Sequence, residues 1–169
     1  FPTSVAVDSA GNIYVADAGN HTIRKATQDG TVKLFAGSGS ADGPGSANGS
    51  GNAARFYFPQ GVAVDSRGNV YVADTYNHKI KELDPKTKRV STLLGSGKPG
   101  QSDGRAASFY EPGGLSVANG KLYIADTNNH AIRVVDLKTK QTATLRLNGL
   151  TPPAKSMATA GVDAGPNAE

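Results

Sequence analysis

The chain has 169 residues, with 18 basic and 14 acidic side chains and a formal net charge of +4. The absence of cysteine excludes a disulfide framework and thiol chemistry, and it is compatible with any compartment, so the sequence assigns no location. No apolar run is long enough to cross a bilayer as a helix.

One sequence pattern occurs three times along the chain. Each copy starts with an apolar segment, continues through a second apolar segment that ends in Ala-Asp, and then reaches an Asn-His pair. The copies begin at Phe1, Phe58 and Glu111. A fixed period in this size range is typical of stacked supersecondary units, so we predict one structural unit built three times.

Each unit has the composition of four short strands separated by turns. Val62 and Val64 alternate with Ala63, which gives a sheet with one bulky and one small apolar face. Such a sheet must be covered on both sides. Radial packing of identical sheets, bulky face on small face, predicts a β-propeller with four strands per blade. In the second unit the predicted strands are 61–65, 69–73, 78–83 and 89–94.

The predicted fold is therefore all-β, with three four-stranded antiparallel blades that form a partial ring, half of a six-bladed propeller. The propeller region is 1–149, with a linker or disordered tail at 150–169, where small and polar residues follow Pro152 and Pro153 without any period. The predicted blades lie at about 1–36, 58–95 and 110–147.

Three blades leave two apolar sheet faces uncovered, which is unusual for a monomer. We expect either the missing blades of a longer chain or self-association of two copies to cover these faces. The start of the sequence inside a first strand favours the longer chain.

A recurring Asp–Asn–His set marks the corner between the second and third strands of each unit. Histidine and carboxylate can ligate a metal, but a set that occurs once per blade is spread around the ring. We interpret it as a hydrogen-bonded structural turn. The innermost strands hold no histidine, and we predict no catalytic residue, no cofactor and no metal site. The turn residues are Asp17, Asn20, His21, Asp74, Asn77, His78, Asp126, Asn129 and His130.

Two long loops, 37–57 and 95–110, are expected on the same face of the propeller as these corners. Binding residues concentrate on such loops. The candidate partner-binding residues on this face are Tyr76, Asn77, His78, Lys98, Arg105 and Asn128.

The positive charge is concentrated between Lys79 and Arg105, a stretch with seven basic and three acidic residues. A basic stretch attracts nucleic acid. No aromatic residues interleave with the lysines, so a pair of solvated outer strands is the simpler interpretation.

The three repeats resemble the NHL-repeat family, which is named for an Asn-His-Leu triplet. After the Asn-His pair this chain has Thr22, Lys79 and Ala131 in place of the leucine. The resemblance extends from Phe1 to about Leu147, and it is nearest to the NHL segment of proteins that also carry a thioredoxin-like domain. It implies a binding platform for protein, RNA or cell-surface ligands, and in a minority of members a metal-dependent lyase. We predict a non-enzymatic binding or scaffolding module for a protein partner. A metal-dependent propeller lyase or lactonase and an RNA-binding domain on the basic second blade are the alternatives.

Overall fold

The computed structural model describes residues 1–39 and 43–147, and in this part of the chain it is built from strands and short 3-10 turns without an α-helix. The predicted tail at 150–169 lies outside the described residues. No described helix is long and apolar enough to cross a membrane.

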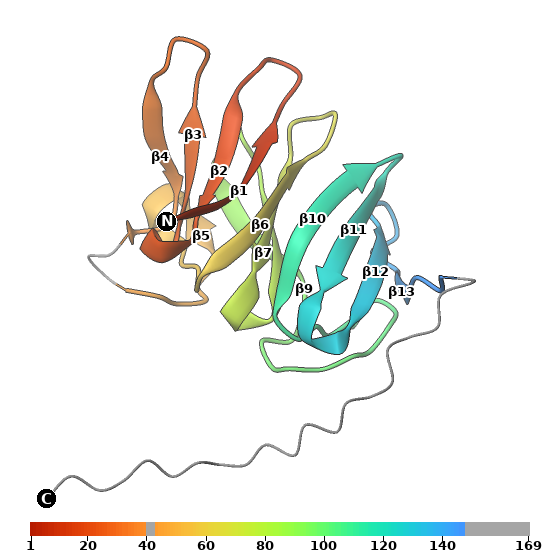
Figure 1. Cartoon of the computed structure of the whole chain (residues 1–169). Coiled ribbons are helices and arrows are strands. Elements are labelled where there is room, and N and C mark those ends of the chain that lie inside the picture. Colours follow the sequence, from red (N-terminus) through yellow and green to blue (C-terminus); the bar gives the residue numbers. More distant parts are fainter. Residues whose placement is uncertain (40–42, 148–169) are drawn as a thin grey trace, which may run out of the picture.

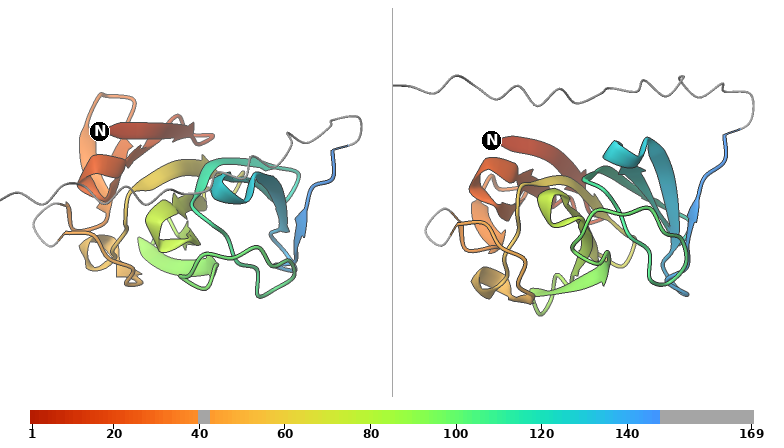
Figure 2. Two further views of the ribbon diagram at one scale, coloured as in Figure 1. Left: turned by 60° about the horizontal axis from the view of Figure 1, so that its bottom comes forward. Right: turned by 90° about the horizontal axis from the view of Figure 1, so that it is seen from below.

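Three antiparallel sheets stand side by side as the blades of an open arc (Figures 1 and 2). Blade 1 contains β1 (Pro2–Val7), β2 (Ile13–Asp17), β3 (Thr22–Ala26) and β4 (Val32–Ala36). Blade 2 contains β6 (Pro59–Val64), β7 (Val70–Asp74), β8 (Lys79–Leu83), β9 (Arg89–Leu94) and the short β5 (Gly49–Ser50). Blade 3 contains β10 (Pro112–Ala118), β11 (Lys121–Asp126), β12 (Ala131–Asp136) and β13 (Thr142–Thr144).

The first hairpin has one turn chemistry in blades 1 and 2 and another in blade 3. In blade 2 the Asp65 carboxylate accepts hydrogen bonds from the backbone of Arg67 and Asn69 and from the Tyr71 hydroxyl. Blade 3 lacks this aspartate and turns through Asn119 and Gly120, which have φ values of 50° and 72°. Two successive residues with positive φ are what the tightest hairpin turn requires.

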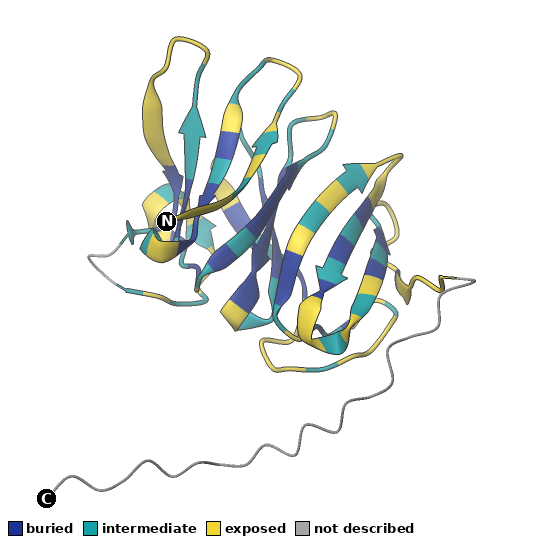
Figure 3. Ribbon diagram, viewed as in Figure 1, coloured by how far each residue is buried: buried dark blue, intermediate teal, exposed yellow. Residues whose placement is uncertain are grey.

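Both faces of the middle blade are buried, as the alternating pattern predicts (Figure 3). On one face the valines of β6 and β7 pack against blade 1, and on the other face the tyrosine and alanines pack against blade 3. The first contact includes Val62, Val70 and Val72 against Tyr14, Ala16 and Ile23. The second includes Ala63, Tyr71 and Ala73 against Leu122, Ile124 and Val135.

The long loops between blades close the outer side of the arc. Phe56 and Phe109, which end the two loops, are fully buried in these interblade cores. The strand β5 comes from the loop before blade 2 and pairs with β9, the last strand of that blade. In blade 3 the bridge between Gly104 and Thr142 takes the same place. Two extended residues carry no pattern of their own, so the sequence does not predict this fifth strand.

The two terminal faces of the arc remain apolar and uncovered among the described residues. On blade 1, Val5 is 63 % and Val7 58 % exposed, although the corresponding Val62 of blade 2 is buried. On blade 3, Ile132 and Leu145 are exposed. Both ends therefore present surfaces that the middle blade buries.

We expect the chain to associate in solution, so that its mass exceeds that of a monomer. Covering the terminal faces stabilises the assembly by about 25 cal/mol per Å2 of apolar area buried. Multi-angle light scattering measures this mass. The double substitution Val5→Lys and Ile13→Lys should shift the mass toward the monomer, whereas Ser66→Lys, in an exposed turn, should not. A stable wild-type monomer would contradict the expectation.

Candidate functional site

The corner after the second strand is the same in all three blades. The strand ends at an aspartate, a single 3-10 turn follows, and a histidine then adopts a left-handed conformation. The turns are η1 (Ala18–Asn20), η4 (Thr75–Asn77) and η5 (Thr127–Asn129). The φ values of His21, His78 and His130 lie between 51° and 56°. This conformation is uncommon for residues other than glycine, so its recurrence shows that the corner imposes it.

In blades 2 and 3 the aspartate and asparagine of the corner bind backbone of the preceding loop. In blade 2 one Asp74 oxygen accepts from the backbone nitrogen of Tyr57 at 2.7 Å, and the other accepts from the Asn77 amide at 2.9 Å. The same amide nitrogen donates to the carbonyl oxygen of Gly45 at 2.7 Å. Blade 3 repeats all three bonds with Asp126, Tyr110, Asn129 and Gly100.

The histidines of the first two corners connect their blades to the next one. His21 Nδ1 accepts a hydrogen bond from the backbone nitrogen of Phe58 at 3.1 Å, and His78 Nδ1 accepts one from Glu111 at 3.1 Å. His130 occupies the same position in blade 3, and its exposed ring has no hydrogen-bond partner among the described residues. The first two rings therefore hold the entry to the following blade.

A cation on the third strand completes each corner. Lys81 lies 3.4 Å from Asp74 and Arg133 lies 2.7 Å from Asp126, and all four side chains are fully buried. Lys81 Nζ also donates to three loop carbonyls, and Arg133 donates to two carbonyls and to Asp103. These acceptors are the carbonyls of Ser46, Ala47 and Arg55 for the lysine and of Ser102 and Ser108 for the arginine.

Burial dominates the electrostatics of the blade 2 pair. It raises the pKa of the Asp74 carboxyl despite the nearby lysine, and it lowers the pKa of the Lys81 ammonium despite the nearby carboxylate. At the more open corner of blade 1, burial acts in the same direction on Asp17, but hydrogen bonds from Arg24 and Asn20 outweigh it and lower the pKa of that carboxyl. Each charge of the blade 2 pair therefore depends on the other for its stability in the interior.

An exposed aromatic surface lies over the corners of blades 1 and 2. The Phe58 and Tyr76 rings are stacked with centroids 5.2 Å apart, and Tyr57 meets Tyr76 edge-on at 5.1 Å. His21 contacts Tyr57, and Phe1 contacts Phe58. Tyr57 and Tyr76 are each 40 % exposed. We call these five residues the aromatic surface.

Blade 3 carries a different surface on the same corner. Glu111 takes the position of Phe58, and the φ values of the two residues are 51° and 52°. Asn128 takes the position of Tyr76. The Asn128 amide donates to the Glu111 carboxylate at 2.8 Å, where blade 2 has a ring stack. The corner thus holds its shape with either pair above it.

The six candidate partner-binding residues do not form one site in the structure. Tyr76 lies in the aromatic surface, whereas the Asn77 and His78 side chains are engaged in the hydrogen bonds of the corner. Asn128 belongs to the corner of blade 3. Lys98 and Arg105 are exposed on the loop 95–110, and Arg105 lies beside the bridge to the outer strand of blade 3.

Sequence reasoning missed Tyr57 and Phe58. Their signal is the run of three aromatic residues from Phe56 to Phe58, of which only the first is fully buried. The positive φ of Phe58 turns its ring toward the corner instead of the core.

The basic stretch is also divided. Lys81 is buried, and the Lys79 ammonium donates to the Ser46 hydroxyl at 2.6 Å. Lys86 and Lys88 lie in the turn between β8 and β9, at the end of the blade opposite the corner, which precedes β8. The structure therefore holds no continuous basic patch over 79–105.

Radially packed antiparallel sheets with a repeated corner define a β-propeller protein. The family model of the NHL repeat matches residues 1–26, 56–83 and 109–135. The chain belongs to the NHL-repeat family.

Similar proteins include an NHL repeat-containing protein and an enzyme. NHL repeat-containing protein 2 of Bos taurus is 44 % identical over 154 residues, which cover 82 % of this chain and 21 % of the relative. A probable peptidyl-alpha-hydroxyglycine alpha-amidating lyase of Caenorhabditis elegans is 34 % identical over 73 residues, or 42 % of this chain and 20 % of the lyase. A crystal structure of a Bacteroides thetaiotaomicron protein of unknown function matches with a TM-score of 0.67 and 29 % identity, over 80 % of this chain and 33 % of that one. The chain spans about a fifth of these two curated relatives.

Lys81→Ala leaves the Asp74 carboxylate buried without its cation and removes the ammonium that donates to three loop carbonyls. We expect the free energy of unfolding to fall by about 3–5 kcal/mol, measured by denaturant titration. Lys81→Arg, which places in blade 2 the residue type of Arg24 and Arg133, should keep most of this stability. Arg24→Ala should cost about 1 kcal/mol or less, since that side chain is 41 % exposed. Equal losses in all three variants would contradict this account of the corner.

Proposed function

We propose that the chain is a non-enzymatic binding module that presents the aromatic surface to a protein partner. The observation that carries the proposal is the stack of the half-buried Phe58 ring on the exposed Tyr76 ring. Blade 3 builds the same corner with Glu111 and Asn128 in these two positions, so the rings are not required to form the blade. Their exposure therefore calls for a role outside the fold.

The chemistry of the aromatic surface fits a protein interface. Tyrosine and phenylalanine are enriched at the cores of such interfaces, and tyrosine is frequent among the residues that carry most of the binding free energy. The backbone beneath the rings is fixed, because Tyr57 donates to Asp74 and Phe58 donates to His21. A surface that is already ordered loses little entropy on binding.

Two hollows among the described residues lie away from the aromatic surface. One lies between β4 and the turn at 84–88, and another lies on the open face of blade 3. Neither is lined by a residue of the aromatic surface. Small ligands favour concave sites, so a ring cluster outside both hollows is better suited to a protein surface.

Two alternatives remain from the sequence. The lyase alternative is supported by the similarity to the amidating lyase of Caenorhabditis elegans. Within residues 1–39 and 43–147, no three or more His, Cys, Asp or Glu side chains are grouped so that they could hold a metal ion. The RNA alternative rested on the basic stretch. Lys81 of this stretch is buried, and Lys86 and Lys88 lie at the end of the blade opposite the corner.

The double substitution Tyr57→Ser and Tyr76→Ser tests the proposal. A photo-crosslinking amino acid at position 58 first captures proteins from an extract of the source organism, and a captured protein is then purified. We expect the double variant to bind that protein at least tenfold more weakly than the wild type in a titration, because interface tyrosines commonly contribute more than 1 kcal/mol each.

Tyr110→Ser is the matched control. Tyr110 is the counterpart of Tyr57 in blade 3 and is similarly exposed, but its ring contact is with His78 alone among the described residues. This variant should bind like the wild type. Equal binding by all three proteins would exclude the aromatic surface, and hydrolytic or lyase turnover after addition of zinc or calcium would favour the enzymatic alternative.

A further inference from the structure

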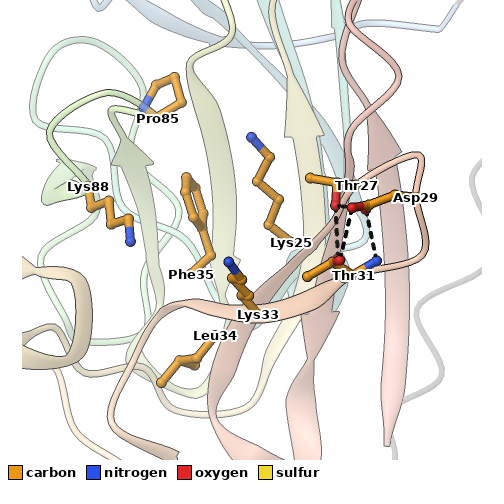
Figure 4. A pocket seen from close by; sticks show the side chains of 9 residues that line it. All are labelled: Lys25, Thr27, Asp29, Thr31, Lys33, Leu34, Phe35, Pro85 and Lys88. Carbon is orange, nitrogen blue, oxygen red and sulfur yellow. Dashed lines mark hydrogen bonds between the residues drawn. The ribbon is translucent and has the colours of Figure 1, made fainter.

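A hollow of about 500 Å3 opens between blades 1 and 2, at the end of the blades opposite the corners. Lys25 and Lys33 enter it from β3 and β4, and Lys88 enters from the turn between β8 and β9. Figure 4 shows the three lysines gathered around Phe35, with Pro85 on the far side. We call it the lysine groove.

The positive charge in the lysine groove exceeds the negative charge, because Asp29 is the one acidic residue among those that line it. No ion pair joins Lys25, Lys33 or Lys88 to an acidic residue in the described part of the chain. Asp29 lines the groove, but its oxygens accept hydrogen bonds from the Thr27 hydroxyl and from the backbone and hydroxyl of Thr31. The groove therefore holds three ammonium groups against one carboxylate, which leaves an excess of positive charge.

The equivalent positions between blades 2 and 3 carry a different pair of residues. Lys25 pairs across the sheet with Tyr14, and in blade 2 the corresponding partner of Tyr71 is Glu82. The counterpart of Lys88 in blade 3 is Lys140, which has the same turn position and a similar positive φ.

Glu82 and Lys140 form an ion pair at 3.8 Å across blades 2 and 3. The same two positions across blades 1 and 2 hold Lys25 and Lys88. One groove is thus neutralised by the protein itself, and the other carries two cations at the equivalent sites and a third, Lys33, beside them.

We propose that the lysine groove is a binding site for an organic phosphate. The three ammonium groups supply the charge that a phosphate requires, and they come from both blades. Phe35, Leu34 and Pro85 supply an apolar wall for the organic part of the ligand. The volume lies within the usual range for small-molecule sites.

Lys25 is held in place before a ligand arrives. Its ammonium lies 5.5 Å from the centroid of the Tyr14 ring and 5.8 Å from that of Phe35, both within the range of cation–π attraction. A ligand phosphate would thus meet a positioned cation.

Isothermal titration at low ionic strength with phenyl phosphate and with inorganic phosphate tests this site. We expect saturable binding of phenyl phosphate at one site per chain, tighter than inorganic phosphate because of the apolar wall. Lys25→Glu, which copies the arrangement of Glu82 and Lys140, should weaken this binding at least tenfold, since it removes one cation and engages Lys88. Lys88→Gln is a second variant, which removes a cation from the groove and leaves the contact between Lys25 and Tyr14 intact.

Lys86→Glu is the matched control, because Lys86 is exposed in the same turn as Lys88 but does not line the groove. It should bind phenyl phosphate like the wild type. Absence of saturable binding to the wild type would overturn the proposal, as would an equal loss in the control, which indicates diffuse charge attraction. Equal affinity for inorganic phosphate would refute the role of the apolar wall. None of these residues belongs to the aromatic surface, so the outcome is independent of the protein-partner proposal.

Discussion

The buried pair of an aspartate with a lysine or arginine is the interaction on which blades 2 and 3 depend. Asp74 ends the second strand, Lys81 enters from the third, and the loop that arrives from the previous blade closes over both. Desolvation makes either charge unfavourable alone, so the pair is stable only while the loop carbonyls surround the cation. One electrostatic requirement thereby fixes the strand corner, the loop path and the order in which blades meet.

Because this frame is satisfied in the same way each time, the surface above it is free to vary. The corner of blade 2 carries the stack of Phe58 on Tyr76, and the corner of blade 3 carries a hydrogen bond between Asn128 and Glu111. At the opposite end, one groove has Glu82 where the other has Lys25. Repeats with a common interior make such differences visible, since each copy serves as a reference for the others.

The fold could be predicted from the sequence because strand alternation and turn residues are local signals. Val62, Ala63 and Val64 show which way the faces point, and the repeat shows what covers them. The candidate sites depend on contacts between distant residues. Lys81 has the same local appearance as Lys79, which is half-buried, yet Lys81 is fully buried because residues 46–55 fold over it. Lys25 and Lys88 likewise meet only through the packing of two blades.

Each loop between blades contributes residues to the blade that follows it. The structural unit therefore begins earlier in the chain than the sequence repeat does. Gly49 and Ser50 pair with the last strand of blade 2 before the first strand of that blade has begun, and Phe56 fills the core beside it. A fragment cut at the start of the repeat, at Phe58, would retain every predicted strand of blade 2 and still lose its edge strand and the acceptors of Lys81. The smallest autonomous piece of this architecture must include the linker that precedes its blade, so natural or engineered boundaries belong before that linker, not after it.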